Sequence, residues 1–374
     1  MRAAALVLAV LAPLALPAAA GEHETSAGRV RVETVGPAFA HPWALAFLPD
    51  FAETGALLVT ERPGRLTLLE DGAARPISGL PPIDDRGQGG LLDVALAPDF
   101  AESRTLFLSH AAPGPDGSAN TVVTRARLNR AEARLEAVDR IFEAASDRRG
   151  GRHFGSRLVF ARDGTLWITT GDRGDRPSAQ DPFSPNGKVH RIAPDGTVPP
   201  DNPFADGAAA LATVWSLGHR NAQGADRHPE TGALWTVAHG ARGGDEVNRP
   251  RPGRNYGWPR VSYGTHYSGR DFPAETSPDT EPPRHHWDPS IAPSGAAFYD
   301  GDLFPDWRGD LLVGALKFRL ISRLDMENGE IVGEERMFED AYGRVRDVRV
   351  GPDGAIWFLT DAGDGRLHRV VPAD

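Results

Sequence analysis

A two-strand unit recurs six times along this chain of 374 residues and constrains its fold more than any other feature. Each copy has a short run of strand-forming residues, a turn containing Asp, Gly or Pro, and a second, mostly apolar run. The clearest copy runs from Leu158-Val159-Phe160 through Asp163-Gly164 to Leu166-Trp167-Ile168, and the other copies begin at Leu45, Val94, Arg227, Ala296 and Val348. Six such units at intervals of roughly 45 to 75 residues predict an all-β, six-bladed β-propeller with long loop insertions.

The segments outside these copies complete the predicted domain organisation. Residues 1–20 combine Arg2, an apolar run and Ala18-Ala19-Ala20, which is typical of a signal peptide. Residues 28–374 are then a single propeller domain. Its early strand Val30 to Val35 has no partner nearby, so we expect it to pair with the last blade and close the ring. Residues 256–290 are expected to form an irregular excursion over one face, and residues 131–145 a short turn at most.

Charge and cysteine content narrow the function classes. The net charge of −10 argues against nucleic acid as a partner, because nucleic-acid binding requires a basic face. After the signal peptide, no apolar stretch is long enough to span a membrane, which predicts a periplasmic or secreted protein. The absence of cysteine means that packing, with or without metal ions, must hold the fold together. Lys188 and Lys317 are the only lysines among 41 basic residues, which suggests sites where arginine does not fit.

Polar residues recur at one phase of the predicted blades, next to the start of each first strand. His153 precedes one hairpin and Asp172 follows it, so both fall at the same end and within reach of each other. The same phase holds His41, Gln88, Arg220, Asn221, Lys317, Arg344 and Arg346. A general base beside several cations suits an anionic, carbonyl-bearing ligand, although each residue alone is equally compatible with a solvated loop.

A turn-rich loop has the character of an ion site. Gly240 to Gly244 precede the carboxylate pair Asp245-Glu246, and Tyr256 follows ten residues later. Calcium takes six to eight oxygen ligands and accepts backbone carbonyls, so a glycine-rich loop with one or two acids is compatible with it. Zinc-protease, thiol and nucleophilic-triad motifs are absent from the sequence.

Eight segments in order resemble the soluble aldose sugar dehydrogenases that depend on pyrroloquinoline quinone (PQQ), relatives of the soluble glucose dehydrogenase. They are His41–Asp50, Gly87–Asp93, His153–Asp172, Gly218–Gly224, Gly243–Asn248, Asn255–Pro259, Gly314–Lys317 and Arg344–Val348. The resemblance covers nearly the whole chain after residue 20.

The resemblance implies a role for each matching position. His153 would be the base that takes the proton of the anomeric hydroxyl while C1 delivers hydride to PQQ, and Asp172 would orient that base. PQQ contacts are implied at Gln88, Arg220, Asn221, Tyr267, Ala315, Leu316, Lys317, Arg344, Val345 and Arg346. One Ca²⁺ would lie on the carbonyls of Gly240 and Ala241, and a second, structural Ca²⁺ on Glu246 and the carbonyl of Tyr256.

Two other functions fit the residues alone: a calcium-dependent lactonase or esterase on the same fold, and a carbohydrate-binding propeller without catalysis. The resemblance itself implies oxidation of aldoses to lactones, with a quinone or a small redox protein as electron acceptor. The chain departs from relatives at Arg152, where an acid can stand, and at Ala241, where proline is common. Monomer and homodimer both remain open.

Overall fold

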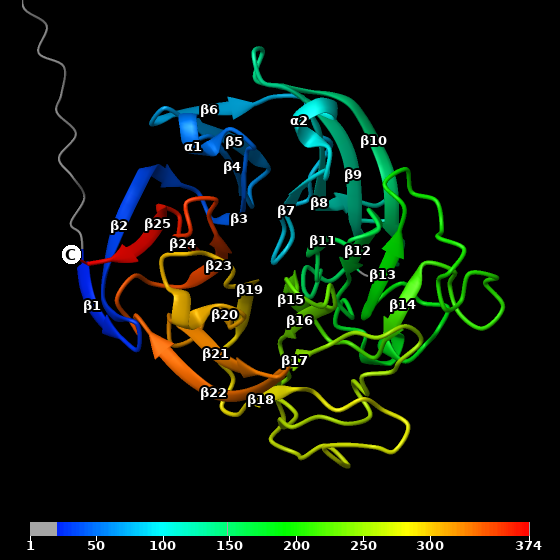
Figure 1. The fold of residues 1–374 in the computed structure, drawn as a ribbon. Coiled ribbons are helices and arrows are strands. Elements are labelled where there is room, and N and C mark those ends of the chain that lie inside the picture. The colour runs from blue at the N-terminus through cyan, green and yellow to red at the C-terminus, as the bar shows by residue number, and fades with distance from the viewer. Residues whose placement is uncertain (1–20, 148, 374) are drawn as a thin grey trace, which may run out of the picture.

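Six β-sheets fan around a central axis in the computed structural model (Figure 1). It describes residues 21–147 and 149–373, so the expected signal peptide at 1–20 lies outside the described residues. Five sheets have four strands each and one has five, all with antiparallel neighbours. The predicted six-bladed β-propeller is therefore confirmed.

Each blade is a meander of consecutive strands. The first three blades hold β3 (Pro42–Phe47), β4 (Leu57–Glu61), β5 (Arg65–Glu70) and β6 (Ala73–Ile77); β7 (Leu91–Leu96), β8 (Thr105–Pro113), β9 (Ala119–Asn129) and β10 (Arg134–Ala144); and β11 (Leu158–Phe160), β12 (Leu166–Thr169), β13 (Lys188–Ile192) and β14 (Val214–Leu217). The next two hold β15 (Ala222–Arg227), β16 (Leu234–Ala238), β17 (Asp245–Asn248) and β18 (His285–Trp287); and β19 (Pro293–Phe298), β20 (Leu311–Ala315), β21 (Ile321–Glu327) and β22 (Glu330–Met337).

The last blade contains both ends of the described chain. β23 (Val345–Val350), β24 (Ile356–Thr360) and β25 (Gly365–Pro372) are followed in the sheet by β2 (Gly28–Phe39) and β1 (Gly21–Thr25). Val32 pairs with Val370 and Val30 with Pro372, which confirms that the early strand closes the ring. β1 precedes residue 28, the expected start of the propeller, and adds a fifth strand by pairing with β2.

The first strand of each blade surrounds the axis. β3, β7, β11, β15, β19 and β23 touch one another in sequence, and β23 returns to β3. Apolar side chains of neighbouring blades pack between the sheets; for example, Phe107 and Val123 of the second blade meet Leu166 and Ile168 of the third. Since all first strands run in the same direction along the axis, the loops that precede them gather at one mouth of the ring.

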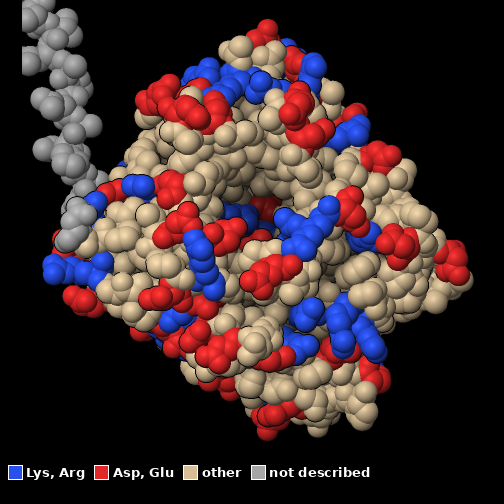
Figure 2. Space-filling model, in the orientation of Figure 1, with Lys and Arg blue, Asp and Glu red and all other residues tan. Residues whose placement is uncertain are grey.

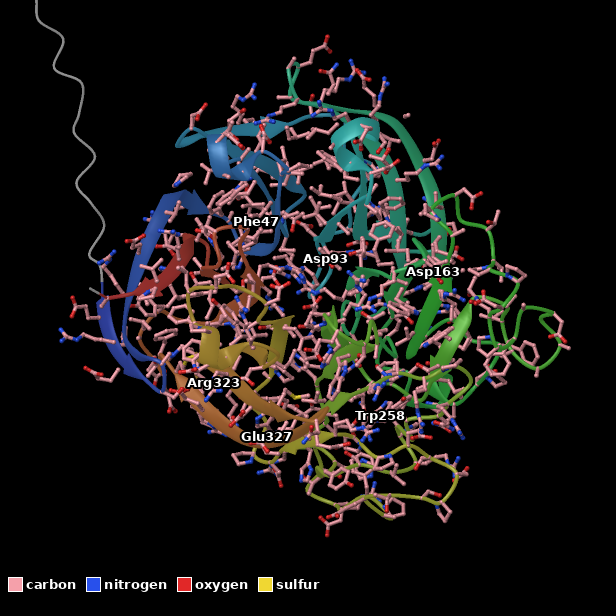
Figure 3. All side chains as sticks on the ribbon, in the orientation of Figure 1. Phe47, Asp93, Asp163, Trp258, Arg323 and Glu327 are labelled. Carbon is pink, nitrogen blue, oxygen red and sulfur yellow. The ribbon has the colours of Figure 1, made fainter. Side chains whose placement is uncertain are left out.

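Buried charges fill the axis itself. The fully buried guanidinium of Arg157 lies 3.0 Å from an oxygen of Asp93 and 3.1 Å from one of Asp347. Arg349 pairs with the same two carboxylates at 3.2 and 3.1 Å. Asp93 lies near the centre of the ring (Figure 3), and Figure 2 shows a hollow there with acidic and basic side chains around it.

Three features of the fold differ from the expectation. Residues 134–144 form β10, the outer strand of the second blade, instead of a short turn. The excursion at 256–290 is mostly irregular, but its end forms β18. Short helices occupy connections: α1 (Phe51–Thr54), α2 (Phe100–Ser103) and the 3₁₀ turns η1 (Arg176–Ala179) and η2 (Pro305–Trp307). None of the helices in the described residues is long and apolar enough to cross a membrane.

Candidate functional site

His153 and Asp172 form a hydrogen-bonded pair at the mouth where the first strands begin. The Nδ1 atom of His153 lies 2.6 Å from Oδ1 of Asp172. His153 comes just before β11 and Asp172 just after β12, and these two strands pair from Leu158↔Ile168 to Phe160↔Leu166. The hairpin therefore brings the two side chains together as predicted. Because Asp172 holds Nδ1, the Nε2 atom is left to face other groups.

Hydrogen bonds hold both Asp172 and the loop that carries His153. Trp258 donates its indole N–H to Oδ2 at 2.9 Å, and the Gly174 amide donates to Oδ1 at 2.7 Å. Asn221 accepts the Gly155 amide at 3.1 Å, and this fixes the loop that carries His153. Gln88 accepts the backbone N–H of His153 at 2.7 Å. The pair is thus preorganised by contacts from the second, third and fourth blades.

Burial and charge set the protonation states of the pair. Burial lowers the pKa of His153, and the charges of Arg220 and Arg152 act in the same direction against the raising effect of Asp172. Burial alone would raise the pKa of Asp172, but the hydrogen bond from His153, its charge, the Gly174 amide and Arg220 together lower it. The resting pair near neutral pH is a neutral imidazole beside a carboxylate, which is the state of a general base.

Arg220 links the pair to the surrounding cavities. Its Nη2 lies 3.4 Å from Nε2 of His153 and donates to the hydroxyl of Tyr267 at 3.1 Å. Its Nη1 donates to the carbonyl of His239 at 3.1 Å. The guanidinium also lies 5.2 Å from the centre of the Trp258 ring, within the range of a cation–π contact. A cation therefore adjoins the free nitrogen of the base.

A cavity of about 270 Å³ lies beside this group. It is lined by Trp43, Arg62, Gln88, Gln223, His239, Ala292, Leu316, Arg344, Arg346 and Asp361. Arg346 donates to Gln223 at 2.9 Å and to Asp361 at 3.2 Å. The buried Nε2 of His239 has no hydrogen-bond partner among the described residues. The lining thus carries three arginines and one aspartate, and Nε2 of His239 is still able to form a hydrogen bond. This set of residues fits an anionic ligand.

A second cavity of about 690 Å³ lies next to the first, because Leu316 lines the first and its neighbour Lys317 lines the second. Its lining is Ala241, Arg242, Gly243, Thr265, Tyr267, Gly269, Asp288, Pro289, Ser290 and Lys317. Tyr267 is two-thirds exposed, at 66%, and offers a ring face beside Arg220. Tyr267 and Lys317 belong to this cavity, whereas Gln88, Leu316, Arg344 and Arg346 belong to the first. The mouth thus brings His153, Arg220, Lys317 and Arg346 to the same side of the ring.

Two of the predicted ligand positions are core residues instead of cavity lining. Val345 and Ala315 are buried and pack in apolar clusters of the last two blades. The carbonyl of Val345 accepts the hydroxyl of Ser294 at 2.7 Å. Asn221 is 2% exposed and holds the base loop. These positions shape the wall of the site from behind.

The predicted calcium positions occupy one blade and the insertion that follows it. Asp245 accepts the Gly240 amide at 2.8 Å, and Ala241 lines the larger cavity. Burial raises the pKa of Glu246 to about 7. Its carboxylate meets the Asn248 amide at 3.0 Å, and the buried Oδ1 of Asn248 has no partner among the described residues. A buried carboxylate beside an unpartnered amide oxygen fits a hard cation.

Tyr256 is buried against His219, with 4.7 Å between ring centres, and its side chain serves the core. Within residues 21–147 and 149–373, no three His, Asp or Glu side chains cluster as metal ligands. Any calcium at these positions would depend on backbone carbonyls, as the sequence resemblance implies for Gly240, Ala241 and Tyr256.

Sequence reasoning missed several residues that complete the site. They are Trp258, His239, Gln223 and Asp361. Their loops and strands could not be assigned to the mouth before the blades were placed. Trp258 was available only as part of the motif Asn255-Tyr256-Gly257-Trp258, with no role attached. Asp361 also pairs with His41 at 2.8 Å, which puts His41 at the same mouth as expected.

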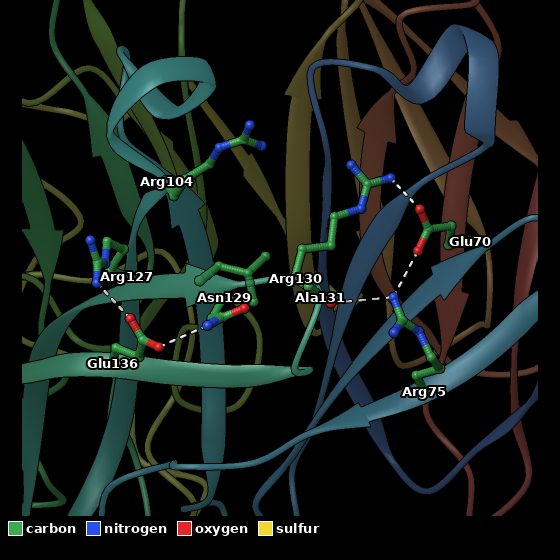
Figure 4. A pocket seen from close by; sticks show the side chains of 9 residues that line it. Glu70, Arg75, Arg104, Arg127, Asn129, Arg130, Ala131 and Glu136 are labelled. Atoms are coloured by element: carbon green, nitrogen blue, oxygen red, sulfur yellow. Dashed lines mark hydrogen bonds and ion pairs between the residues drawn. The ribbon is translucent and has the colours of Figure 1, made fainter.

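A third hollow lies elsewhere, on the outer side of the first two blades (Figure 4). It measures about 700 Å³ and contains Arg75, Arg104, Arg127 and Arg130. Glu70 pairs with Arg75 and Arg130, and Glu136 pairs with Arg127 at 2.6 Å. Three of its four arginines are paired with its own two carboxylates, and none of the predicted site residues lines it. The mouth with His153 is the candidate active site.

Comparison with known proteins agrees with this assignment. The aldose sugar dehydrogenase YliI of Escherichia coli K12 is 42% identical over 348 residues, which are 92% of this chain and 93% of that protein. The solved apo-form of the soluble E. coli aldose sugar dehydrogenase superposes with a TM-score of 0.88 over 92% of this chain and 100% of that one. The PQQ-bound aldose sugar dehydrogenase of Streptomyces coelicolor is 27% identical with a TM-score of 0.76, covering 94% and 99%. The glucose/sorbosone dehydrogenase profile matches residues 39–369, and the chain therefore belongs to that family.

Proposed function

We propose that this protein is an exported quinoprotein that oxidises aldose sugars at C1 to lactones, with PQQ and Ca²⁺ as cofactors. One observation carries the proposal: Asp172 holds Nδ1 of the half-buried His153, and its Nε2 lies 3.4 Å from Arg220 beside two cation-lined cavities. Family membership and the PQQ-bound relative support the redox chemistry.

His153 removes the proton of the anomeric hydroxyl. Its Nδ1 proton is committed to Asp172, so Nε2 is the acceptor, and burial together with Arg220 keeps it unprotonated. As the imidazolium forms, the adjacent Asp172 carboxylate stabilises its charge. The C1–H bond breaks with its electron pair while the C1–O bond becomes a carbonyl, so the sugar loses one proton and one hydride.

PQQ, when bound, supplies the two-electron acceptor for that hydride. Its three carboxylates would be held by Arg344, Arg346 and Lys317, which are available as cations at the mouth. Arg220 and Tyr267 would bound its ring from the side of the base. The carbonyls of Gly240 and Ala241 would hold the Ca²⁺ that polarises the quinone carbonyl. Glu246 and Tyr256 would hold a second, structural Ca²⁺.

The downstream electron acceptor in this proposal is a quinone or a small redox protein, and the compartment is periplasmic or secreted space. A calcium-dependent lactonase would need no cationic ring around the base, and a binding module would need no Asp172 to orient His153. The observed cluster of Arg220, Arg344 and Arg346 around the mouth favours the oxidoreductase over both.

The experiment is reconstitution of purified apo-protein with PQQ and Ca²⁺, followed by a panel of aldoses with an artificial redox dye. We expect a quinone absorbance change on binding and dye reduction with at least one aldose. His153→Gln should retain the absorbance change and lose turnover by about 10²- to 10⁴-fold, the usual contribution of a general base. Failure of the wild type to change absorbance or reduce dye would overturn the proposal. Persistent sugar binding without turnover would instead support the binding module.

A further inference from the structure

Lys188 is the strongest feature that the proposed mechanism leaves unused. Its side chain is fully buried, at 0% exposure, in a protein that otherwise uses arginine for nearly all basic positions. The ammonium donates to three backbone carbonyls, those of Ser178 at 2.8 Å, Ala179 at 3.1 Å and Asn186 at 2.7 Å. A lysine has three N–H donors, so all of them are used.

These carbonyls belong to one loop that runs directly behind the catalytic pair. Residues 178–186 leave the 3₁₀ turn η1 and return to β13, where Lys188 is the first residue. The hydroxyl of Ser178 donates to the carbonyl of Asp175 at 2.6 Å and lies 3.4 Å from the carbonyl of Asp172. Gly187 donates to the carbonyl of Gly171 at 3.0 Å and accepts from His219, the neighbour of Arg220. The loop and the adjoining Gly187 therefore contact the backbone on both sides of the site, beside Asp172 and beside Arg220.

Ala179 carries this loop to the tryptophan that holds Asp172. It packs with Trp258 and Phe272 in a small apolar cluster, and Gln180 donates to the carbonyl of Trp258 at 2.7 Å. The indole of Trp258 in turn donates to Asp172. Gly187, with φ of 65°, lies so close to Ala179 that a Cβ would sit 2.7 Å from the alanine methyl. The ammonium of Lys188 thus closes a tightly packed turn, and that turn also contacts Trp258, which supports the carboxylate of Asp172.

We propose that Lys188 is a positioning residue for the catalytic pair: by clamping the loop 178–186 through three carbonyls, it fixes Trp258 on Asp172 and keeps water away from the buried carboxylate of Asp172. The proposal rests on the proposed function for its kinetic consequences and on geometry for the rest. Arginine does not suit this place, because its planar fork cannot direct three donors inward from one point as an ammonium does.

Burial lowers the pKa of Lys188 to about 7, and the charge of Asp181 opposes this shift. The three carbonyl acceptors also favour the ammonium form, because a neutral amine has only two N–H donors. His190 and His219 face the same region, and burial, with the charge of Lys188, lowers the pKa of each to about 4 and about 3. Both histidines are therefore neutral, and no second positive charge competes for the three carbonyls.

The test compares Lys188→Met with Arg323→Met. Arg323 is also a buried cation, paired with Asp310 and Glu335 at the outer side of the fifth blade, away from the mouth (Figure 3). Both variants should lose thermal stability. Only Lys188→Met should lower kcat by about tenfold or more with little change in KM, because the base is displaced while the substrate cavity is kept.

A second readout requires no turnover. In the apo-protein, nuclear magnetic resonance titration of the His153 imidazole, assigned by its absence in His153→Gln, should show a pKa closer to the ordinary 6.5 in Lys188→Met. Water entry behind Asp172 would cause that rise. Trp258→Phe, which removes the indole donor without any change of charge, should shift the His153 pKa in the same direction.

Chemical rescue separates the clamp from the general effect of a destabilised fold. Lys188→Ala leaves the three carbonyls open to a small cation, so methylammonium should restore part of kcat and return the His153 titration toward the wild-type value. Unchanged kcat and an unchanged imidazole titration in Lys188→Met would overturn the proposal, and so would wild-type His153 titration in Trp258→Phe. A wild type without dye reduction would overturn the proposed function alone, since the titration tests the clamp independently.

Discussion

His153 uses its two ring nitrogens differently, and this division sets how the protein should respond to pH. The imidazole acts as a base only when neutral, and its folded pKa lies below the ordinary 6.5 because of burial and Arg220. Turnover should therefore persist as the pH falls to 6.5 and decline only at more acidic pH, as His153 becomes protonated. The measurement is kcat/KM against pH with the reconstituted protein.

Asp172→Asn tests the partner of this base. The carboxylate raises the pKa of His153 by its hydrogen bond and its charge, so its removal should move the acidic limb of the profile to still lower pH. The rate at neutral pH should fall by about 10²-fold or more, because the imidazolium loses its counter-charge. Asp71→Asn, in the exposed turn between β5 and β6, is the matched control and should leave the profile unchanged. An unmoved limb in Asp172→Asn would contradict the assignment.

Glu246 offers a residue-scale test of the metal. Its buried carboxylate and the unpartnered Asn248 oxygen predict that Ca²⁺ stabilises the fold, since a ligand that binds only the native state raises its stability. Calcium should raise the melting temperature of the apo-protein, and a chelator should reverse the rise. Glu246→Gln should weaken the response, whereas Glu132→Gln, on an exposed turn, should keep it. Equal responses in the two variants would argue against a site at Glu246.

The pair at the heart of the site could be read from the sequence, but its supports could not. A hairpin brings the residue before its first strand next to the residue after its second, so His153 and Asp172 required only local pairing. Trp258 reaches Asp172 from an irregular insertion 86 residues away, and Asp361 reaches Arg346 from the turn after β24. Such contacts depend on how loops fold over the mouth, which no periodicity records.

At the scale of elements, short apolar runs beside turns predicted the inner strands, whereas outer strands such as β1 and β10 lack such runs. Residues 131–145 contain several helix-favouring residues, Ala and Glu among them, and show no alternation, yet 134–144 form β10. Pairing with β9 overrides that preference. An outer strand buries few of its side chains, so its sequence needs no apolar alternation. β1 escaped notice for a similar reason: Gly21 to Thr25 are polar, and only the neighbouring β2 makes them a strand.

The closing strand β2 yields a prediction about stability. Val32 is 1% exposed, opposes Val370 and packs in the apolar cluster of the last blade. Val32→Ala should lower the free energy of unfolding by about 2 kcal/mol, from lost burial and the cavity that remains. Arg29→Ala lies in the same strand with an exposed side chain and should change it by less than about 0.5 kcal/mol. Denaturant titration measures both values, and similar losses would contradict the closure as a source of stability.

At the scale of the whole molecule, the charges on the axis hold blades together that share no strand pairing. Arg157 precedes β11 and joins Asp93 of β7 to Asp347 of β23. Arg157→Leu would leave these carboxylates with Arg349 alone, so we expect a loss of about 3–5 kcal/mol. Arg308→Leu, which breaks an exposed pair with Asp302, should cost less than about 1 kcal/mol. Comparable losses in the two variants would contradict a central role for the axial cluster.

The last blade is assembled from the two extremes of the chain, β23 to β25 from one and β2 with β1 from the other. During synthesis, β2 can pair with β1 but cannot pair with β25 until the ribosome has made residues 365–372, so the ring stays open for nearly the whole time of translation. Tags or truncations at either terminus should accordingly disturb the same sheet, although β2 and β25 lie more than three hundred residues apart in the sequence.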